Sequence, residues 1–284
     1  MSRTESPLRR LGRALVPRAA RNVLRRPGAA LRALAQFARA GLGSYDSYAV
    51  RPDWMVICHP ASTAAFRAQN DHPDSRAELD GFIRLCRPGM VLLDAGSHFG
   101  IFVLAAVRYG GPEARVLAVD PSDECAGIFR TNLRLSNAAA QVDVIRAAVG
   151  DHDGQIEMLT TGAAGDYFMV TAESPRPDAV ARPQITLETL ARRSARPVTH
   201  LKIDVEGHEA VIVSANRAWL QAARPLLFLE LHSKLIRARG QDPRAVLGML
   251  GECGYGRLEH HGRPITAEVA AALPVTRLIA FPVA

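Results

Sequence analysis

Residues 90–100 read MVLLDAGSHFG, and this stretch decides the fold. An apolar run of strand length ends in Asp94 and a glycine turn, and the apolar stretch 101–109 follows. This order predicts a strand, a tight loop and a helix. We expect Gly96 to take a positive φ or admit a ligand closely, and Gly100 to let the helix pack on its strand. Free N–H groups of the loop would then face the ligand.

Asp94 narrows the choice of ligand. A carboxylate at the strand end would repel a dinucleotide pyrophosphate, and the G-x-G-x-x-G spacing of nicotinamide binders is absent. The acid favours a ligand with a cationic end, such as the amino-acid part of S-adenosylmethionine. A purely structural glycine turn is the alternative.

Strand and helix patterns alternate along most of the chain. Strands are predicted over 91–95, 115–119, 141–149, 198–204, 225–231, 254–261 and 276–283, and helices over 75–86, 99–109, 122–135, 207–218 and 243–252. Such alternation predicts an α/β fold with a mostly parallel sheet and helices on both faces. The last two strands are expected to be antiparallel neighbours. Residues 45–60 suggest a strand or hairpin edge, and residues 154–189 an inserted hairpin and a mobile loop.

The positive charge is concentrated at the N-terminus. The chain has a net charge of +7, yet residues 1–40 hold ten Arg and one Glu. We therefore predict a basic helical arm over 1–43 and a near-neutral domain over 44–284, with its core from residue 75. Apolar residues at helical spacing predict one helix from Ser6 and a second ending near 41–43.

This arm suits an anionic membrane surface or an acidic partner, while a solvated extension and a transit peptide are alternatives. The neutral domain predicts no nucleic-acid partner. Four cysteines lie far apart without zinc spacing: Cys58, Cys86, Cys125 and Cys253. With no signal peptide and no apolar run of bilayer length, a cytoplasmic protein is expected, with peripheral membrane attachment left open.

Two further predicted strands also end in acids. Asp120 follows the glycine loop by about twenty residues, the separation that places a carboxylate against ribose hydroxyls. Residues 201–209 read LKIDVEGHE, which brings Asp204 and Glu206 to a third strand end, where Gly207 permits a close turn. Acids at the carboxyl ends of neighbouring strands are expected to share one crevice.

The chain here resembles the FkbM family of S-adenosylmethionine-dependent methyltransferases. The resemblance covers about residues 75–235 and is carried by LDAG with Gly100, VDP at 119–121, AAVG at 147–150, the LKIDVEGHE run and FLELH at 228–232. Many relatives have Ala-Asn where this chain has Ser97-His98. The resemblance implies a class I methyltransferase (Rossmann-like) three-layer fold, with a seven-stranded sheet whose last strand is antiparallel.

The resemblance also implies O-methylation of hydroxyls on sugars or secondary metabolites. Carried over by position, the residues expected to bind the cofactor are Asp94, Gly96, Ser97, Phe99 and Gly100 for its methionine part, Asp120 for its ribose and Asp151 for its adenine amine.

Methyl transfer depends mainly on alignment, because the sulfonium is already electrophilic. A nearby base would still assist a hydroxyl nucleophile by roughly 10²- to 10⁴-fold. We predict that Asp204, Glu206 and His232 are catalytic, and His208 is a further candidate. Because side chains alternate along a strand, Glu230 and His232 should lie on the same face of the sheet. Asp204 and Glu206 are alternatively suited to a divalent metal.

The sequence therefore predicts an S-adenosylmethionine-dependent O-methyltransferase acting on a saccharide, glycolipid or secondary metabolite. The alternative is a non-catalytic, methyltransferase-like binding module tethered by its basic arm. A nicotinamide-dependent oxidoreductase would require the missing glycine pattern.

Overall fold

The computed structural model describes residues 27–160, 167–169 and 179–283. Its large sheet has the strand order β13-β12-β14-β11-β10-β3-β4-β5. The strands are β3 Val91–Ala95, β4 Arg115–Val119, β5 Val142–Ile145, β10 His200–Ile203, β11 Leu226–Leu231, β12 Tyr255–His260, β13 Arg263–Pro264 and β14 Thr276–Pro282.

The strand directions confirm the predicted class I methyltransferase sheet. Pairing is parallel from β5 through β11, and β14 is antiparallel to both of its neighbours, β11 and β12. The two-residue strand β13 adds an eighth strand to the seven expected. The predicted antiparallel pairing of the last two long strands is likewise confirmed.

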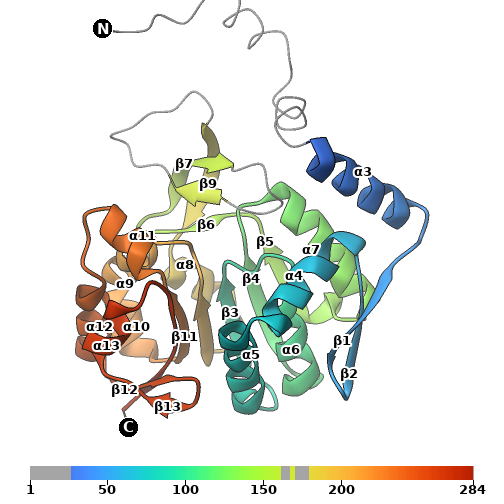
Figure 1. The fold of residues 1–284 in the computed structure, drawn as a ribbon. Coiled ribbons are helices and arrows are strands. Elements are labelled where there is room, and N and C mark those ends of the chain that lie inside the picture. The colour runs from blue at the N-terminus through green and yellow to red at the C-terminus, as the bar shows by residue number, and fades with distance from the viewer. Residues whose placement is uncertain (1–26, 161–166, 170–178, 284) are drawn as a thin grey trace, which may run out of the picture.

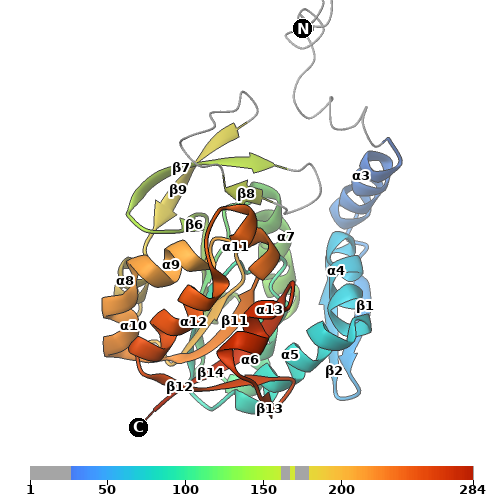
Figure 2. The ribbon, with the colours of Figure 1, turned by 60° about the vertical axis from the view of Figure 1, so that its left-hand side comes forward.

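Helices cover both faces of this sheet (Figures 1 and 2). One side carries α4 Pro60–Asp71, α5 Pro73–Leu85, α6 Ile101–Gly110 and α7 Asp123–Leu135. The other carries α8 Leu187–Arg192, α9 Glu209–Ala215, α10 Arg217–Ala223, α11 Ser233–Ala238, α12 Pro243–Glu252 and α13 Ala267–Ala272. A 3₁₀ turn, η1 Ala139–Gln141, precedes β5.

The buried strands divide their side chains between two cores. Leu93 packs into the cluster beneath α8 to α13, while Leu92 packs into the cluster beneath α4 to α7. In β10, Leu201 and Ile203 belong to the first cluster, so the side chain between them, Lys202, lies on the α4 to α7 side of the sheet. This alternation places a charged residue inside an apolar layer.

A second, four-stranded sheet lies beyond one end of the large sheet (Figures 1 and 2). It consists of β6 Ala148–Val149, β7 Gly154–Thr160, β8 Tyr167–Met169 and β9 Ala179–Ile185, in the order β6-β9-β7-β8. Near the N-terminus, helix α3 Pro27–Gly41 precedes the hairpin β1 Asp46–Arg51 and β2 Trp54–Cys58.

The structure differs from the sequence prediction in several elements. Helices α4, α11 and α13 were not predicted, and the expected helix 207–218 is divided into α9 and α10. The expected strand 141–149 is also divided, because β6 leaves the large sheet and pairs with β9. The end of the predicted loop, residues 179–189, instead forms β9 and the start of α8.

The predicted second helix of the arm is confirmed as α3, whereas the first lies outside the described residues. The division into arm and domain stays a prediction. Among the described residues, none of the helices has both the length and the apolar character needed to cross a membrane.

Candidate active site

A cavity of about 260 Å³ opens where strands β3, β4 and β10 end. Seven of the ten residues predicted for the site line it: Gly96, Ser97, Phe99, Gly100, Asp120, Asp204 and Glu206. The other three, Asp94, Asp151 and His232, do not line it. The structure therefore brings Asp120 and Asp204 together, as expected from parallel strands that end at one edge.

The two glycines of the first loop are required for close packing. Gly96 has a φ of 90°, and a Cβ atom there would lie 1.9 Å from the carbonyl oxygen of Asp204. Gly100 has a φ of 88°, and its Cβ would lie 2.0 Å from the ring of Phe129 in α7. Positive φ at Gly96 was expected. Gly100 was expected to let the following helix pack on its strand. That reason was wrong, because the space that a Cβ would need is occupied by the side chain of Phe129 in α7.

The backbone N–H groups of this loop mostly have partners within the protein. Gly96 and Ser97 donate to the carbonyl of Val119 at 2.9 and 3.1 Å, and His98 donates to Asp120 at 3.0 Å. For these three residues the expectation that the N–H groups face the ligand was therefore wrong, and for the first turn of α6 it stays a prediction. Their hydrogen bonds fasten the loop to the end of β4 and fix the shape of the cavity.

Asp120 connects the first two strand ends. Its Oδ2 accepts the hydrogen bond from His98, and its Oδ1 accepts one from the backbone of Ser122 at 2.8 Å. Burial raises the pKa of Asp120, against the effect of these hydrogen bonds. Nearby, the hydroxyl of Ser97 is buried without a hydrogen-bond partner among the described residues. A buried polar atom of this kind in a cavity suits a polar ligand.

Asp94 lies beneath the cavity floor. It is 1% exposed, and its Oδ1 has no hydrogen-bond partner among the described residues. In the parallel register Asp94 is directly opposite Lys202. Burial raises the pKa of Asp94 to about 7, although the charge of Lys202 works in the opposite direction.

Lys202 is the main site residue that sequence reasoning missed. It is 2% exposed, lines the cavity, and donates from Nζ to Asp204 Oδ2 at 3.0 Å. Its ammonium also lies 4.7 Å from the centre of the Phe102 ring. Burial opposes its charge, but nearby carboxylates raise the pKa of Lys202 above its usual value. The sequence did contain a signal that could have identified Lys202: it is a lysine at the centre of a predicted buried strand.

Asp204 faces the cavity as an ionised carboxylate. Burial alone would raise its pKa, but Lys202 and His232 together lower the pKa of Asp204 below its usual value. The next turn contains Glu206, which has a positive φ of 52°. A non-glycine residue in this conformation is uncommon and is often found at functional sites.

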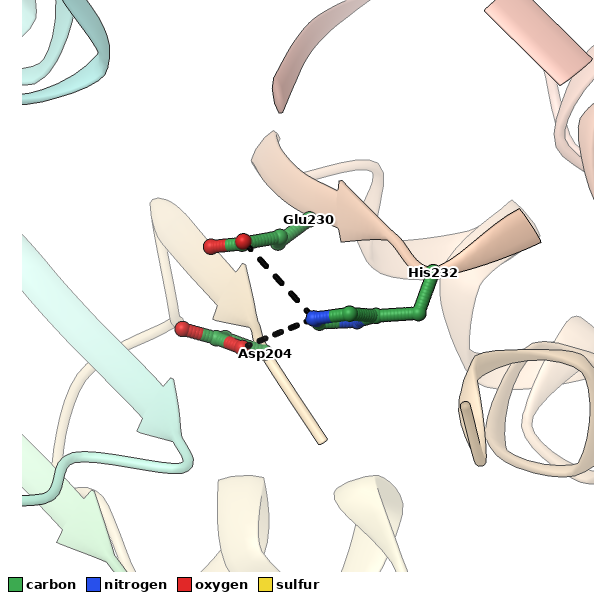
Figure 3. A group of neighbouring side chains, drawn as sticks. All are labelled: Asp204, Glu230 and His232. Carbon is green, nitrogen blue, oxygen red and sulfur yellow. Dashed lines mark ion pairs between the residues drawn. The ribbon is translucent and has the colours of Figure 1, made fainter. Parts of the chain in front are cut away.

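His232 lies just behind the cavity, surrounded by acids. Its Nδ1 is 2.7 Å from Glu209 Oε1, and its Nε2 is 3.5 Å from Glu206, 3.7 Å from Glu230 and 4.0 Å from Asp204. Burial lowers its pKa, but these carboxylates raise the pKa of His232 to about 9. Figure 3 shows the ring edge directed between Asp204 and Glu230.

Glu230 extends this cluster to Arg277 of β14 and Glu78 of α5. It accepts a hydrogen bond from Arg277 at 2.6 Å, and Arg277 also bonds Glu78 at 3.2 Å. Burial and the nearby charges of Asp204 and Glu78 raise the pKa of Glu230 to about 8. The prediction that Glu230 and His232 share one face agrees with their 3.7 Å separation.

The two remaining candidates lie apart from the cavity lining. Asp151 is exposed and bonds His152 and Gln184 at 2.8 and 2.9 Å. His208 is buried with no hydrogen bond to either ring nitrogen among the described residues, and burial lowers its pKa to about 4. The adenine contact of Asp151 stays a prediction.

Part of the cavity wall comes from residues that were not predicted for the site. Helix α4 contributes Ala65, Phe66 and Gln69, and the small sheet contributes Ala148, Val149 and Met158. No motif marks the side chains of α4 in the sequence, whereas Ala148 and Val149 belong to the AAVG run of the family resemblance. They give the cavity an apolar wall opposite its acidic edge.

The strand order of the large sheet is that of a class I methyltransferase fold, and the cavity lies at the carboxyl ends of its parallel strands. The sequence profile of the methyltransferase FkbM domain matches residues 94–256. The chain therefore belongs to the FkbM methyltransferase family. No curated protein matches the chain.

Three solved structures illustrate the likeness of the fold. The methyltransferase FkbM of Methylobacillus flagellatus is 14% identical with a TM-score of 0.44; the match covers 78% of this chain but only 59% of that one. The S-adenosylmethionine-dependent O-methyltransferase of Thermotoga maritima is 13% identical (74% and 65% covered, TM-score 0.42). A putative rRNA methylase of Clostridium thermocellum is 9% identical (75% and 97% covered, TM-score 0.47).

Proposed function

We propose that this protein transfers a methyl group from S-adenosylmethionine to a hydroxyl group of a saccharide, glycolipid or secondary metabolite. One observation supports this most strongly. The acids that end β4 and β10, Asp120 and Asp204, line one cavity together with the glycine loop 96–100. The family to which the chain belongs supports the same cofactor.

The residues around the cavity suit this cofactor. The buried, unpartnered hydroxyl of Ser97 offers a polar contact, and Asp120 presents a carboxylate for ribose hydroxyls. The apolar side chains of Phe99, Val149 and Met158 suit a flat aromatic base. When bound, S-adenosylmethionine supplies an electrophilic methyl carbon.

In the proposed reaction, Asp204 would orient the acceptor hydroxyl and accept its proton, while the methyl carbon passes from the donor sulfur, which leaves as a thioether, to the hydroxyl oxygen. The ionised state of Asp204 suits this role, and Lys202 holds the carboxylate in place. Glu206 would bind the acceptor from the adjacent turn. His232 orients Asp204 from behind, because its raised pKa keeps the imidazole charged at neutral pH.

Calorimetry with S-adenosylmethionine tests the cofactor site. We expect Asp120→Ala to weaken cofactor binding at least about tenfold, which corresponds to a loss of about 1.4 kcal/mol of binding free energy. Asp143→Ala, which removes an exposed carboxylate from β5, should leave binding unchanged. Equal affinity of the Asp120 variant and the wild type would contradict the assigned site.

Transfer of a labelled methyl group to a panel of glycans tests turnover. With an acceptor in hand, Asp204→Asn should lower kcat by about 10²-fold or more and leave cofactor affinity within a factor of about three. Equal loss of both would remove Asp204 from the proposed role. Cofactor binding with no transfer to any acceptor would favour the alternative of a binding module.

We also propose that the arm attaches the protein to an anionic membrane surface. Helix α3 exposes Leu31 and Leu34 by 67% and 63%, and Phe37 by 43%. In the sequence, these apolar residues lie close to the ten arginines of residues 1–40, a combination typical of segments that lie in a membrane interface. The absence of a nucleic-acid partner stays a prediction.

Vesicle sedimentation tests the attachment. The intact chain should sediment with phosphatidylserine-containing vesicles and remain in solution with phosphatidylcholine alone. Deleting residues 1–40 should abolish sedimentation and preserve cofactor affinity. Equal sedimentation of the truncated and intact chains would refute the role of the arm.

A further inference from the structure

We propose that Asp204, Glu230 and His232 bind a divalent cation, which holds a hydroxyl of a sugar-like acceptor where two cavities meet. This inference rests on the proposed methyl transfer and deepens it by naming an ion site and an acceptor class. Asp204 lines the cavity assigned to the cofactor, and Glu230 lines a second cavity on the other side of the cluster.

The three side chains converge at distances that suit a metal ion. One carboxylate oxygen from each acid and one nitrogen of His232 lie within 4.8 Å of one another. The nitrogen is 3.7 Å from Glu230 and 4.0 Å from Asp204 (Figure 3). Ligands of an octahedral Mg²⁺ are about 3 Å apart when adjacent and about 4 Å apart when opposite. Small side-chain rotations would therefore complete the site.

The orientation of His232 is an independent indication. The ring is 5% exposed, and its Nδ1 bonds Glu209 Oε1 at 2.7 Å. Among the described residues Nε2 makes no hydrogen bond, although it is directed between the two acids. A histidine that bonds a carboxylate through one nitrogen and faces further acids through the other, as Nε2 does at 3.5 to 4.0 Å, has the usual arrangement of a metal ligand.

The local charge also favours a divalent cation. Four carboxylates lie within 4.0 Å of the His232 ring: Asp204, Glu206, Glu209 and Glu230. Lys202 contacts Asp204, Arg277 contacts Glu230, and the charge of Arg239 acts on Glu209. The four acids outnumber these three cations, and an ion bound at Nε2 of His232 would take the place of the imidazole proton.

The second cavity suits a polyhydroxylated acceptor. Its volume is about 790 Å³. Apolar surface forms the larger part of its wall, and polar side chains that suit hydroxyl groups are distributed over it: Gln69, His72, Asp74, Ser75, Glu230, His260 and Arg277. Ala65 and Gln69 of α4 line both cavities. An acceptor in the second cavity would therefore reach the first near the proposed cation.

Binding of Mn²⁺ to cofactor-free protein, followed by electron paramagnetic resonance, tests this site without any methyl transfer. We expect one Mn²⁺ per chain, displaced by Mg²⁺. Glu230→Gln and His232→Gln should each weaken Mn²⁺ binding at least about tenfold. Asp242→Asn, which alters an exposed acid, should have no effect. Circular dichroism verifies the fold of each variant. If only one of the two site variants folds, that variant alone is enough to test the site.

The outcomes separate the two proposals. No bound Mn²⁺ in the wild type, or equal Mn²⁺ affinity in the wild type and the site variants, would overturn the cation site. Asp120→Ala should retain Mn²⁺ and lose S-adenosylmethionine. Wild-type protein that binds S-adenosylmethionine but no Mn²⁺ refutes only the cation site, and the converse result refutes only the cofactor site.

Discussion

Replacing Lys202 by Met should destabilise the protein strongly, because it removes a buried cation from among buried acids. Lys202 is 2% exposed, contacts Asp204 at 3.0 Å, and is influenced by the charges of Glu78, Asp94 and Glu230. Methionine fills a similar volume, so the change removes charge with little loss of packing. Breaking a buried ion pair from one side costs about 3 to 5 kcal/mol.

The free energy of unfolding, measured with urea and circular dichroism at pH 7.5, checks this value. At about 2 to 4 °C per kcal/mol for a domain of this size, the midpoint of thermal unfolding should fall by about 6 to 20 °C. A chelator in the buffer prevents divalent ions from replacing the lost charge. Lys234→Met is the matched control, since Lys234 is the chain's other lysine and is exposed.

A second substitution identifies the origin of the loss. If the cost comes from the uncompensated carboxylate of Asp204, adding Asp204→Asn to the Lys202→Met chain should recover at least about 1 kcal/mol. A Lys202→Met protein within about 1 kcal/mol of the wild type would refute the reasoning. Such a result would mean that the neighbouring acids become neutral in the variant at little cost.

Two further predictions follow from the same region. Gly96→Ala should lower the free energy of unfolding in urea by more than about 3 kcal/mol, because its Cβ would lie 1.9 Å from a carbonyl oxygen. Gly43→Ala is the control: Gly43 also has a positive φ but lies in open space, so the loss should be only about 1 kcal/mol. Equal losses would contradict the packing argument. Asp94→Asn should gain stability relative to the wild type between pH 6 and pH 8. The folded-state pKa of Asp94 is about 7, above its unfolded value near 3.9, so the wild type loses stability as pH rises through 7. If the variant instead lost stability relative to the wild type over this range, the raised pKa of Asp94 would be contradicted.

The sequence was sufficient to predict which strand ends form the site. Each of Asp94, Asp120 and Asp204 lies at or just beyond the end of an apolar run, and the carboxyl ends of parallel strands lie at one edge of a sheet. Asp120 and Asp204 do line one cavity, whereas Asp94 lies beneath it. The difference is two residues of register, because Asp94 lies opposite Lys202 inside the sheet, whereas Asp204 lies two positions beyond Lys202 and just past the end of β10.

Helix α4 and strand β9 could not be predicted in the same way, because they are fixed by distant contacts. Strand β6 leaves the large sheet only because residues 179–185 return to pair with it, and two residues carry no periodic signal of their own. Helix α4 has a mixed composition and mainly packs against α5 and α3. Helix α4 and strand β6 both contribute side chains to the cavity, so part of its wall was missed when their places in the fold were not predicted.

The buried charge cluster follows from the alternation of strands once their order is known. Asp94, Lys202 and Phe228 are register partners on three adjacent strands, so all three side chains project to the same face, and Glu230 lies two residues beyond Phe228 on that face. An acid placed there requires a cation nearby, since an isolated buried charge is costly. Lys202, a buried cation, likewise requires acids nearby. We therefore expect substitutions at these positions to be coupled: neutralising one partner should be tolerated only when the charge opposite it is neutralised as well.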